Sequence, residues 1–378
     1  MRNFAKIIII PDSFKGGMSS STVCEIAERA IKEQFHEVQV EKIPVADGGE
    51  GTVDAMLTAI GGKKIHAKVH GPFGDEINSF YGMLPNGSAI IEMAAAAGLP
   101  LAAGRLNPLR ASTYGVGELM KHAIQHGCRH IILGMGGSAT NDAGCGAAAA
   151  LGVQFFNENG KTFIPVGETL SQIYHIDKSG CRLPVGVTAM CDIDNPLYGP
   201  NGAAFVFSPQ KGANAQQVAL LDAQLRAFAQ VTLQEMGTDI AQIAGGGAAG
   251  GFGAGAVCFF SAVLKKGIEI VLDTVDFDTR LQSASLVITG EGRIDTQSLR
   301  GKVVIGVASR AKVYGVPVIA VVGDVGDDIS EAYDMGINAV FSINRVAVPF
   351  DRAVLRSKQD LYSTLSDVMR FARVLIDK

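Results

Sequence analysis

The sequence predicts an α/β protein in which both ends of the chain form a doubly wound, mostly parallel sheet. A second α/β domain with a mixed sheet is expected to be inserted in the middle. Two observations carry this prediction. Apolar strands alternate with amphipathic helices at the N-terminus, and the same alternation returns after residue 285. Between these segments, short strands follow one another directly, which is typical of a separate mixed sheet.

The N-terminal segment begins with a strand of the kind that is buried on both faces of a sheet. Residues 5–10 include an uninterrupted run of isoleucines and end at a Pro-Asp-Ser turn, which indicates a parallel strand. Residues 19–35 carry apolar side chains at helical spacing, and the serines that open this segment offer an N-cap. A strand over residues 38–45 and a helix over residues 52–60 are expected to follow.

The C-terminal segment repeats the alternation of strands and helices. The pattern predicts strands over residues 286–289, 316–322 and 339–342, helices over 303–313 and 329–335, and an amphipathic helix after residue 350. We expect residues 1–60 and 285–378 to form one Rossmann-like or flavodoxin-like domain.

Residues 61–284 are expected to form the inserted domain, with the active site in the cleft between the two domains. Short strands over residues 65–69, 76–84 and 88–93 would form a meander. A helix over residues 114–126, a strand over 130–135 and a helix of small residues over 143–151 are predicted to follow.

Composition and charge limit the classes of function. The chain has 378 residues, of which 47% are apolar and 19% charged, and this fits a globular enzyme of about two domains. A net charge of −4 gives no sign of the basic surface with which proteins bind nucleic acid. The six cysteines are scattered without metal-type spacing, and the apolar run near the N-terminus is too short for a secretory signal or a membrane span. We expect a cytoplasmic protein that binds neither nucleic acid nor a membrane.

Polar residues follow the predicted strands of the first domain, at the edge where ligands bind in open parallel sheets. These candidate residues are Asp12, Ser13 and Lys15, then Asp47, Gly48 and Gly49, and finally Glu291, Arg293, Asp295 and Asp324. Carboxylates, bases and glycines beside helix N-termini are what phosphoryl transfer requires, because the protein must hold Mg²⁺ and neutralise developing negative charge. The competing interpretation is that each loop holds ordinary turn and cap residues.

The inserted domain offers further candidates. The segment Gly134 to Asp142 follows a strand and precedes a helix, so its amides and Ser138 would cradle a phosphate or a carboxylate, or simply cap the helix. Asp192 lies in a Cys-Asp-Ile-Asp-Asn segment that would supply acidic ligands. Weaker candidates for contacts with a carboxylate are Asn107 and Arg110. The remaining candidates of this domain are Gly136, Gly137 and Asn141.

Several familiar motifs fail on inspection. The run Gly245 to Gly250 satisfies GxGxxG, but no convincing strand precedes it, so close helix packing or a nucleotide-facing loop is favoured over a dinucleotide fingerprint. There is no GxxxxGK[ST] motif of P-loop enzymes and no GxSxG motif of serine hydrolases.

Taken together, six segments carry a resemblance to a known family. PDSFKGGMSS, PVADGGEGT, GMGGSATNDAG, CDIDNPLYGPNGAA, GGGAAGGFGAG and VITGEGRIDTQSLRGK closely resemble, in this order, the bacterial glycerate kinase family. The resemblance covers essentially the whole chain. One local departure is Gly16-Gly17-Met18, where family members often have Glu-Ser-Leu. What the resemblance implies is transfer of the γ-phosphoryl group of ATP to D-glycerate, giving 2-phospho-D-glycerate, in a two-domain protein with one domain inserted in the other.

Roles for the candidates follow as hypotheses. Asp47 is favoured as the base that accepts the proton of the acceptor hydroxyl, with Asp192 as the alternative. Glu291 and Asp295 are expected to hold Mg²⁺ or to position groups, and Lys15 and Arg293 to stabilise charge on the transferred phosphoryl group. The other named residues, Asp12 and Ser13 among them, would bind substrate or phosphate.

Alternatives remain for the activity. A glycerate kinase that gives 3-phosphoglycerate fits the same residues. The doubly wound sheet and the glycine run also suggest an NAD-dependent hydroxyacid dehydrogenase, and the two-domain plan suggests a sugar-acid sensor. The surplus of carboxylates disfavours a sensor, because they would repel an anionic ligand unless a metal intervened. The expected partners are D-glycerate and ATP, and a homo-oligomer is left open.

Overall fold

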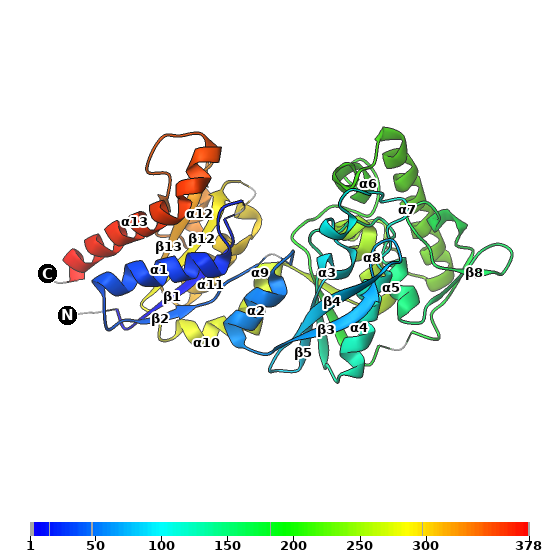
Figure 1. Cartoon of the computed structure of the whole chain (residues 1–378), viewed down its shortest axis with the longest axis horizontal. Helices are drawn as coiled ribbons and strands as arrows, with labels where there is room; N and C mark the ends of the chain where they lie inside the picture. Colours follow the sequence, from blue (N-terminus) through cyan, green and yellow to red (C-terminus); the bar gives the residue numbers. More distant parts are fainter. Residues whose placement is uncertain (1–3, 15, 47, 182, 297, 377–378) are drawn as a thin grey trace. The chain divides into compact units, whose positions relative to one another are not determined.

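The chain forms two compact units, which we call the terminal unit and the central unit. The structure is a computed structural model that describes residues 4–14, 16–46, 48–181, 183–296 and 298–376. The terminal unit comprises Met1–Asp47, Thr58–Ile60 and Ile268–Lys378, and the central unit comprises Gly48–Leu57 and Gly61–Gly267 (Figure 1). Both ends of the chain therefore belong to the same unit, as the α/β pattern predicts. The predicted domain limits at residues 60 and 285 stay predictions.

A five-stranded parallel sheet forms the centre of the terminal unit. Its strand order is β14-β13-β12-β1-β2. The bounds are β1 (Lys6–Pro11), β2 (Gln39–Lys42), β12 (Leu286–Ile294), β13 (Val318–Val325) and β14 (Ala339–Ser342). Because β2 lies on one side of β1 and β12 on the other, the direction of winding reverses between β1 and β12. The carboxyl ends of these two strands are where ligands bind in such sheets.

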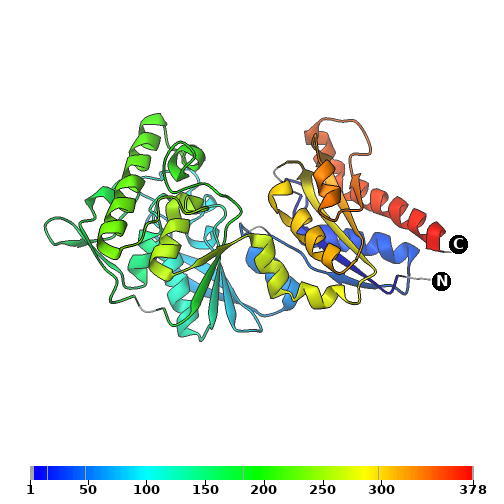
Figure 2. The ribbon, with the colours of Figure 1, turned by 180° about the vertical axis from the view of Figure 1, so that it is seen from behind.

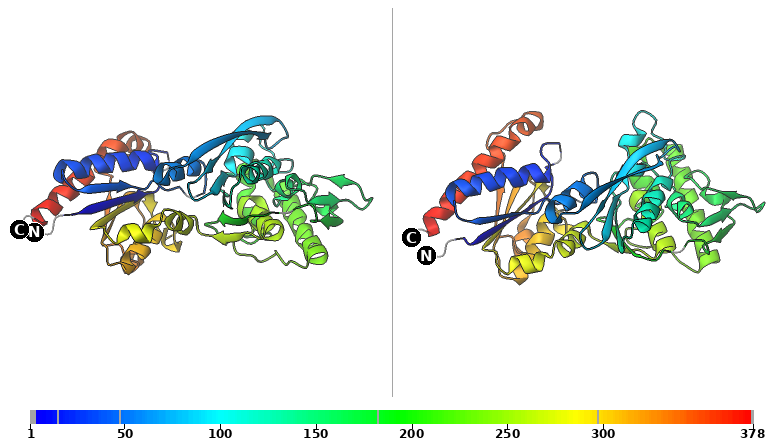
Figure 3. Two further views of the ribbon diagram at one scale, coloured as in Figure 1. Left: turned by 90° about the horizontal axis from the view of Figure 1, so that it is seen from below. Right: turned by 60° about the horizontal axis from the view of Figure 1, so that its bottom comes forward.

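Helices cover both faces of this sheet. Its helices are α1 (Ser20–Gln34), α9 (Gly267–Thr274), α10 (Phe277–Leu281), α11 (Val303–Val313), α12 (Ser330–Asp334) and α13 (Phe350–Ile376). Helices α1 and α13 pack side by side in front of the sheet in Figure 1, and α11 lies on the opposite face, which Figures 2 and 3 show. Helix α1 begins as predicted, because the Ser19 side chain accepts a hydrogen bond from the backbone N–H of Thr22 at 3.2 Å.

The central unit contains a mixed six-stranded sheet in the order β11-β10-β6-β5-β4-β3 and a small antiparallel sheet in the order β8-β7-β9. Strands β5, β6, β10 and β11 are parallel, whereas β3 and β4 pair antiparallel as the predicted meander. The bounds are β3 (Lys63–His70), β4 (Glu76–Met83), β5 (Ser88–Glu92), β6 (His130–Gly134), β7 (Gln154–Phe156), β8 (Thr162–Phe163), β9 (His175–Asp177), β10 (Gly186–Met190) and β11 (Val263–Lys265).

The helices of the central unit enclose a core of their own, in which Tyr81, Phe155, Phe228 and Phe259 are fully buried. They are α2 (Thr52–Ile60), whose last turn is counted with the terminal unit, α3 (Ala94–Ala97), α4 (Tyr114–Gln125), α5 (Cys145–Ala150), α6 (Ala203–Phe207), α7 (Ala215–Met236) and α8 (Ala248–Phe260). Short 3₁₀ helices lie at η1 (Pro100–Ala102), η2 (Leu170–Gln172), η3 (Pro209–Lys211) and η4 (Ser298–Arg300). Helix α7 and the small sheet are elements that the sequence pattern did not predict.

The structure confirms the predicted fold class and corrects two local expectations. Residues 290–294 and 323–325 were expected in loops after strands, but they continue β12 and β13. The reason is pairing: Arg293 lies opposite Asp324, and Ile294 lies opposite Val325, so the parallel ladder extends beyond the apolar run. From the sequence alone, glycine and charged residues at these positions resemble turn signals, because the neighbouring strand is not known.

Among the helices of the described residues, none has the length and the apolar composition that are needed to span a membrane.

Candidate active site

Two buried carboxylates lie level with the carboxyl end of β1, where the winding of the sheet reverses and β12 continues beyond β1. Pro11 lies opposite Gly290 in the parallel ladder, so Asp12 and Glu291 follow at the same edge of the sheet. The backbone N–H of Asp12 donates to the carbonyl of Gly290 at 2.8 Å, and this fixes the chain as it leaves β1. Only 9% of Asp12 and 5% of Glu291 is exposed. Buried carboxylates of this kind require a compensating partner.

The environment of Glu291 fits a bound cation. Its Oε1 atom is buried and has no hydrogen-bond partner among the described residues. Burial raises the pKa of Glu291 to about 7, and the negative charges of Asp12 and Asp295 raise this pKa further, while the Ser298 hydroxyl and Lys302 act in the opposite direction. A divalent cation beside Glu291 would offset the burial of its charge and give Oε1 a partner. This is the electrostatic character expected of a magnesium position.

The described residues do not enclose a metal ion by themselves: they contain no group of three carboxylate, imidazole or thiol side chains arranged to hold one. Mg²⁺ differs from metals that need such cages, because it is usually held by one or two carboxylates together with the phosphates of a substrate. The arrangement of Glu291 and Asp295 is therefore suited to Mg²⁺ that arrives with a nucleotide.

Arg293 brings positive charge to the same edge. Its guanidinium lies 3.7 Å from Oδ2 of Asp295 and 3.8 Å from Oδ2 of Asp324, and its side chain is 59% exposed. Both separations exceed hydrogen-bond distance, so the two carboxylates attract the guanidinium without fixing it. An arginine that is accessible and loosely held in this way is suited to meet an incoming phosphate.

Of the remaining predicted residues in the terminal unit, Ser13 follows Asp12 and its backbone N–H donates to the Asp12 Oδ1 atom at 2.6 Å. Lys15 and Asp47, the predicted charge clamp and the predicted base, lie outside the described residues.

In the central unit, the loop of Gly48 and Gly49 packs directly on the ends of two strands. The N–H of Gly136 donates to the carbonyl of Gly48 at 3.0 Å. A Cβ atom on Gly136 would lie 2.6 Å from the Cα of Gly49, and one on Gly48 would lie 2.9 Å from the Cβ of Met190. Side chains are excluded from these contacts, so the two predicted glycine loops meet at the carboxyl ends of β6 and β10.

Asp192 lies two residues beyond β10, at the same edge of the central sheet. Its Oδ1 atom accepts a hydrogen bond from the backbone N–H of Gly267 at 2.8 Å, and the residue is exposed. The carboxylate therefore orients the chain that leaves the central unit, and it remains accessible to a ligand.

A buried lysine lies beneath the loop that follows β6. Lys211, in the short helix η3, is 2% exposed, and its Nζ donates to Ser138 Oγ at 2.9 Å and to the carbonyl of Thr140 at 2.6 Å. Burial lowers the pKa of Lys211 to about 7, and the charge of Asp142 acts against this shift. The predicted residue Ser138 is therefore held by an ammonium group that no local motif indicated.

The Asp142 carboxylate is held by backbone N–H groups at the start of the helix that follows this loop. It accepts hydrogen bonds from the backbone N–H groups of Thr113, Gly144 and Gly146 at 2.8 to 3.2 Å. The helix that was expected over residues 143–151 is only Cys145–Ala150, and the N–H groups of its N-cap Gly144 and of Gly146 are used by this internal carboxylate. Asn141 is fully buried, and neither of its side-chain polar atoms has a partner among the described residues.

The glycines at the start of α8 and within it serve close packing. A Cβ atom on Gly250 would lie 2.0 Å from the carbonyl oxygen of Thr140, and one on Gly255 would lie 1.9 Å from that of Ala143. Helix α8 therefore packs directly on the segment that follows β6, which accounts for these glycines without a dinucleotide. Asn107 closes a turn by accepting from the N–H of Leu109, and Arg110 pairs with Glu168 at 3.1 Å on the rim of a separate surface pocket of about 770 Å³.

The buried carboxylates of the terminal unit and the glycine loops at the carboxyl ends of β6 and β10 can be compared with known proteins. The profile of the glycerate kinase family matches residues 7–373. The chain belongs to the glycerate kinase family.

Members of this family align with the chain over nearly its full length. It is 45% identical to the glycerate kinase of Bacillus subtilis over 368 residues, covering 96% of both chains. It is 43% identical to the glycerate 2-kinase of Escherichia coli K12, covering 97% of this chain and all of the relative. A crystal structure from Salmonella typhimurium LT2, provisionally named glycerate kinase 2, matches with a TM-score of 0.88 and 40% identity over the whole of both chains.

Beside the glycine loops of the central unit, sequence reasoning missed two buried charged residues of this glycerate kinase family member. Glu92 is 1% exposed at the end of β5, and its Oε1 atom accepts from the N–H of Val53 at 2.7 Å, so it caps α2 beside the Gly48 loop. Lys211 is the second. The signal for Glu92 was its position at the end of an apolar strand, whereas Lys211 stands in an ordinary Pro-Gln-Lys-Gly turn.

We predict that Lys211→Met removes a pH dependence of stability. The ordinary pKa of lysine is 10.5 and the folded value is about 7, so between these values the unfolded chain binds a proton that the folded chain has released. The wild-type free energy of unfolding should therefore rise with pH over this window, by up to about 1.4 kcal/mol per pKa unit. Urea unfolding at pH 7, 8 and 9 measures the slope.

The control for this experiment is Lys161→Met, which changes an exposed lysine of the same unit. It should keep the wild-type slope. Equal slopes in the wild type and in Lys211→Met would show that burial does not lower the pKa of Lys211.

Proposed function

We propose that this enzyme transfers the γ-phosphoryl group of ATP to the 2-hydroxyl of D-glycerate, giving 2-phospho-D-glycerate. The observation that carries the proposal is the buried Glu291 cluster at the switch point of the sheet, in a chain that matches glycerate kinases from end to end. Family membership supports the kinase chemistry and the use of ATP, and the name of the Escherichia coli relative supports the 2-hydroxyl. A product phosphorylated at the 3-hydroxyl is the alternative within the same reaction class.

The terminal unit is proposed to hold the phosphates of ATP. Glu291 and Asp295 would hold Mg²⁺, with Asp12 beside them, and Mg²⁺ when bound supplies neutralisation of charge on the phosphates. Arg293 and Lys15 would stabilise the negative charge on the transferred group, because a loosely held guanidinium can follow a moving phosphoryl group. Ser13 would contribute its hydroxyl to the same position.

The central unit is proposed to hold D-glycerate. Gly48, Gly49, Gly136 and Gly137 bring backbone close to the carboxyl ends of β6 and β10, and Ser138 is oriented by Lys211. Asn141, Asn107 and Arg110 stay candidates for contacts with the substrate carboxylate. Asp47 is proposed as the base that accepts the proton of the 2-hydroxyl, with Asp192 as the alternative. That the active site lies between the two domains stays a prediction of the sequence.

The first prediction concerns the reaction. Incubation with D-glycerate, ATP and Mg²⁺ should give the ³¹P signal of 2-phosphoglycerate, because the acceptor is proposed to be the 2-hydroxyl. A 3-phosphoglycerate signal would support the kinase activity but show that the 3-hydroxyl, and not the 2-hydroxyl, is the acceptor. Unchanged ATP, together with an absorbance change of NAD in the presence of D-glycerate, would instead favour the dehydrogenase.

A second prediction concerns the magnesium position. Glu291→Gln should lower kcat by at least about a hundredfold, since even outer partners of metal ligands are worth about 10–100-fold. Mn²⁺ binding in the presence of ATP, followed by electron paramagnetic resonance, should weaken in parallel. The matched control is Glu331→Gln, an exposed residue of α12 in the same unit. Unaltered Mn²⁺ binding in Glu291→Gln would remove this residue from the metal position.

A third prediction concerns the base. Asp47→Asn should reduce kcat by about a hundredfold or more, with little change in the far-ultraviolet circular dichroism, because a positioned general base contributes about 10²–10⁴. Asp192→Asn is the comparison. Near-normal turnover of Asp47→Asn, combined with a large loss in Asp192→Asn, would transfer the base role to Asp192.

A further inference from the structure

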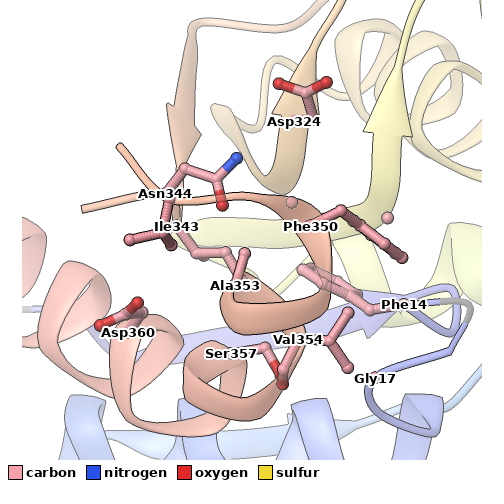
Figure 4. A pocket seen from close by; sticks show the side chains of 13 residues that line it. Phe14, Gly17, Asp324, Ile343, Asn344, Phe350, Ala353, Val354, Ser357 and Asp360 are labelled. Carbon is pink, nitrogen blue, oxygen red and sulfur yellow. The ribbon is translucent and has the colours of Figure 1, made fainter. Parts of the chain in front are cut away.

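We propose that a pocket of the terminal unit beside β13, β14 and the start of α13 binds the nucleoside half of ATP and selects adenine. The inference rests on the proposed kinase function and adds where the nucleotide is recognised. The pocket has a volume of about 270 Å³. Figure 4 shows it from close by, with Asp324 at one end, Ile343 and Asn344 just after β14, and Phe350, Ala353 and Val354 from α13.

The charge of the pocket favours an uncharged group. Of the described residues that line it, none is a lysine or an arginine. The two charged residues among them are carboxylates, Asp324 and Asp360, and the second of these is paired with Arg356 at 3.1 Å. A triphosphate or a glycerate anion would be repelled here, whereas a base and its ribose carry no charge. Among the proposed substrates, only the nucleoside part of ATP is uncharged.

Aromatic side chains supply a surface for a base. Phe14 is 5% exposed and is fixed by a tight turn, in which its N–H donates to the carbonyl of Met18 at 2.8 Å. Phe350 is 75% exposed. The two rings lie on the same side of the pocket in Figure 4. A large aromatic side chain exposed at the rim of a pocket is a suitable partner for stacking, because every base presents a π-face.

Asn344 supplies the polar edge that distinguishes bases. It follows β14, and its carboxamide extends into the pocket in Figure 4. A carboxamide donates and accepts at neighbouring atoms, and this matches the amino group and adjacent ring nitrogen of adenine. Guanine presents acceptors at the corresponding O6 and N7 atoms, which suit arginine better. The pocket is therefore expected to prefer adenine.

The position of the pocket agrees with the phosphate site. Gly292, which lines the pocket, is adjacent in sequence to Glu291, and Asp324 lies 3.8 Å from the guanidinium of Arg293. A nucleoside in the pocket would direct its phosphates toward Arg293 and Glu291. The volume is smaller than the roughly 300–1,000 Å³ of sites that hold a complete drug-sized ligand, so only part of the nucleotide fits. The ribose would meet the Asp324 carboxylate, which can accept from its hydroxyls.

The decisive experiment uses the absence of tryptophan from the sequence. In Phe350→Trp, the introduced indole is the only tryptophan and lies at the rim of the pocket. MgADP and uncharged adenosine should both change its fluorescence, because the base stacks beside it, and D-glycerate alone should not. The matched control is Phe371→Trp, which places an exposed indole on the same helix away from the pocket. Its fluorescence should not respond to adenosine.

A second pair of variants measures affinity. Ala353→Trp fills the pocket and should weaken MgADP binding in calorimetry by about five- to hundredfold, since a stacked base is worth that much. Ala372→Trp, on α13 outside the pocket, is its control and should bind MgADP normally. Asn344→Ala, which leaves the helix intact, should bind MgADP and MgGDP with similar affinity, whereas the wild type should prefer MgADP.

The outcomes separate this inference from the kinase proposal. If the wild type forms phosphoglycerate but Phe350→Trp does not respond to saturating MgADP, and Ala353→Trp binds MgADP as tightly as the wild type, the nucleoside lies elsewhere and the inference fails while the kinase stands. If adenosine alters Phe350→Trp but no phosphoglycerate forms, the pocket is a nucleoside site and the proposed reaction is wrong. Equal affinity of the wild type for MgADP and MgGDP would overturn the selection of adenine.

Discussion

The parallel pairing of β1 with β12 is the interaction on which the rest of the terminal unit depends. It joins Ile7 to Leu286 and Pro11 to Gly290, two stretches at opposite ends of the chain with the central unit between them. The register is reinforced inside the sheet, where the Thr289 hydroxyl donates to the carbonyl of Ile10 at 2.8 Å. A slip of one residue would turn the side chains to the opposite face of the sheet. This pairing therefore brings Asp12 and Glu291 to one edge of the sheet, where the charge of Asp12 helps to raise the pKa of Glu291.

Close approach of backbone plays the corresponding role in the central unit. Gly134 lies against the carbonyl of Gly48, where a Cβ atom would come within 2.4 Å, and Gly250 lies against the carbonyl of Thr140. Two segments distant in the sequence can then pack on the loops that follow β6 and β10 without side chains between them. At these positions glycine is required for close packing of the backbone. This packing holds the proposed substrate loops in place.

Each unit buries a charged group whose pKa is shifted strongly toward neutrality, and the two groups have opposite signs. Glu291 in the terminal unit and Lys211 in the central unit both have a pKa of about 7, the first raised and the second lowered by burial. Such groups are costly to bury and are concentrated at functional sites, where a ligand of opposite charge compensates them. A cation beside Glu291 fits this logic directly. Lys211 is compensated internally by the Ser138 hydroxyl and the Thr140 carbonyl, so it orients the loop.

The sequence by itself determined the fold class and most regular elements, because a buried strand such as β1 and an amphipathic helix such as α1 repeat their apolar residues with the period of the backbone. It also determined the family, since six polar and glycine-rich segments recur in order, and it named Glu291 and Ser138 as candidates. Only the tertiary structure decided that Glu291 stands inside a strand rather than in a loop, that Asp142 caps its own helix, and that Lys211 is buried beneath Ser138. The physical reason is that burial, strand pairing and electrostatic partners are set by residues far apart in the chain, and no local pattern records them.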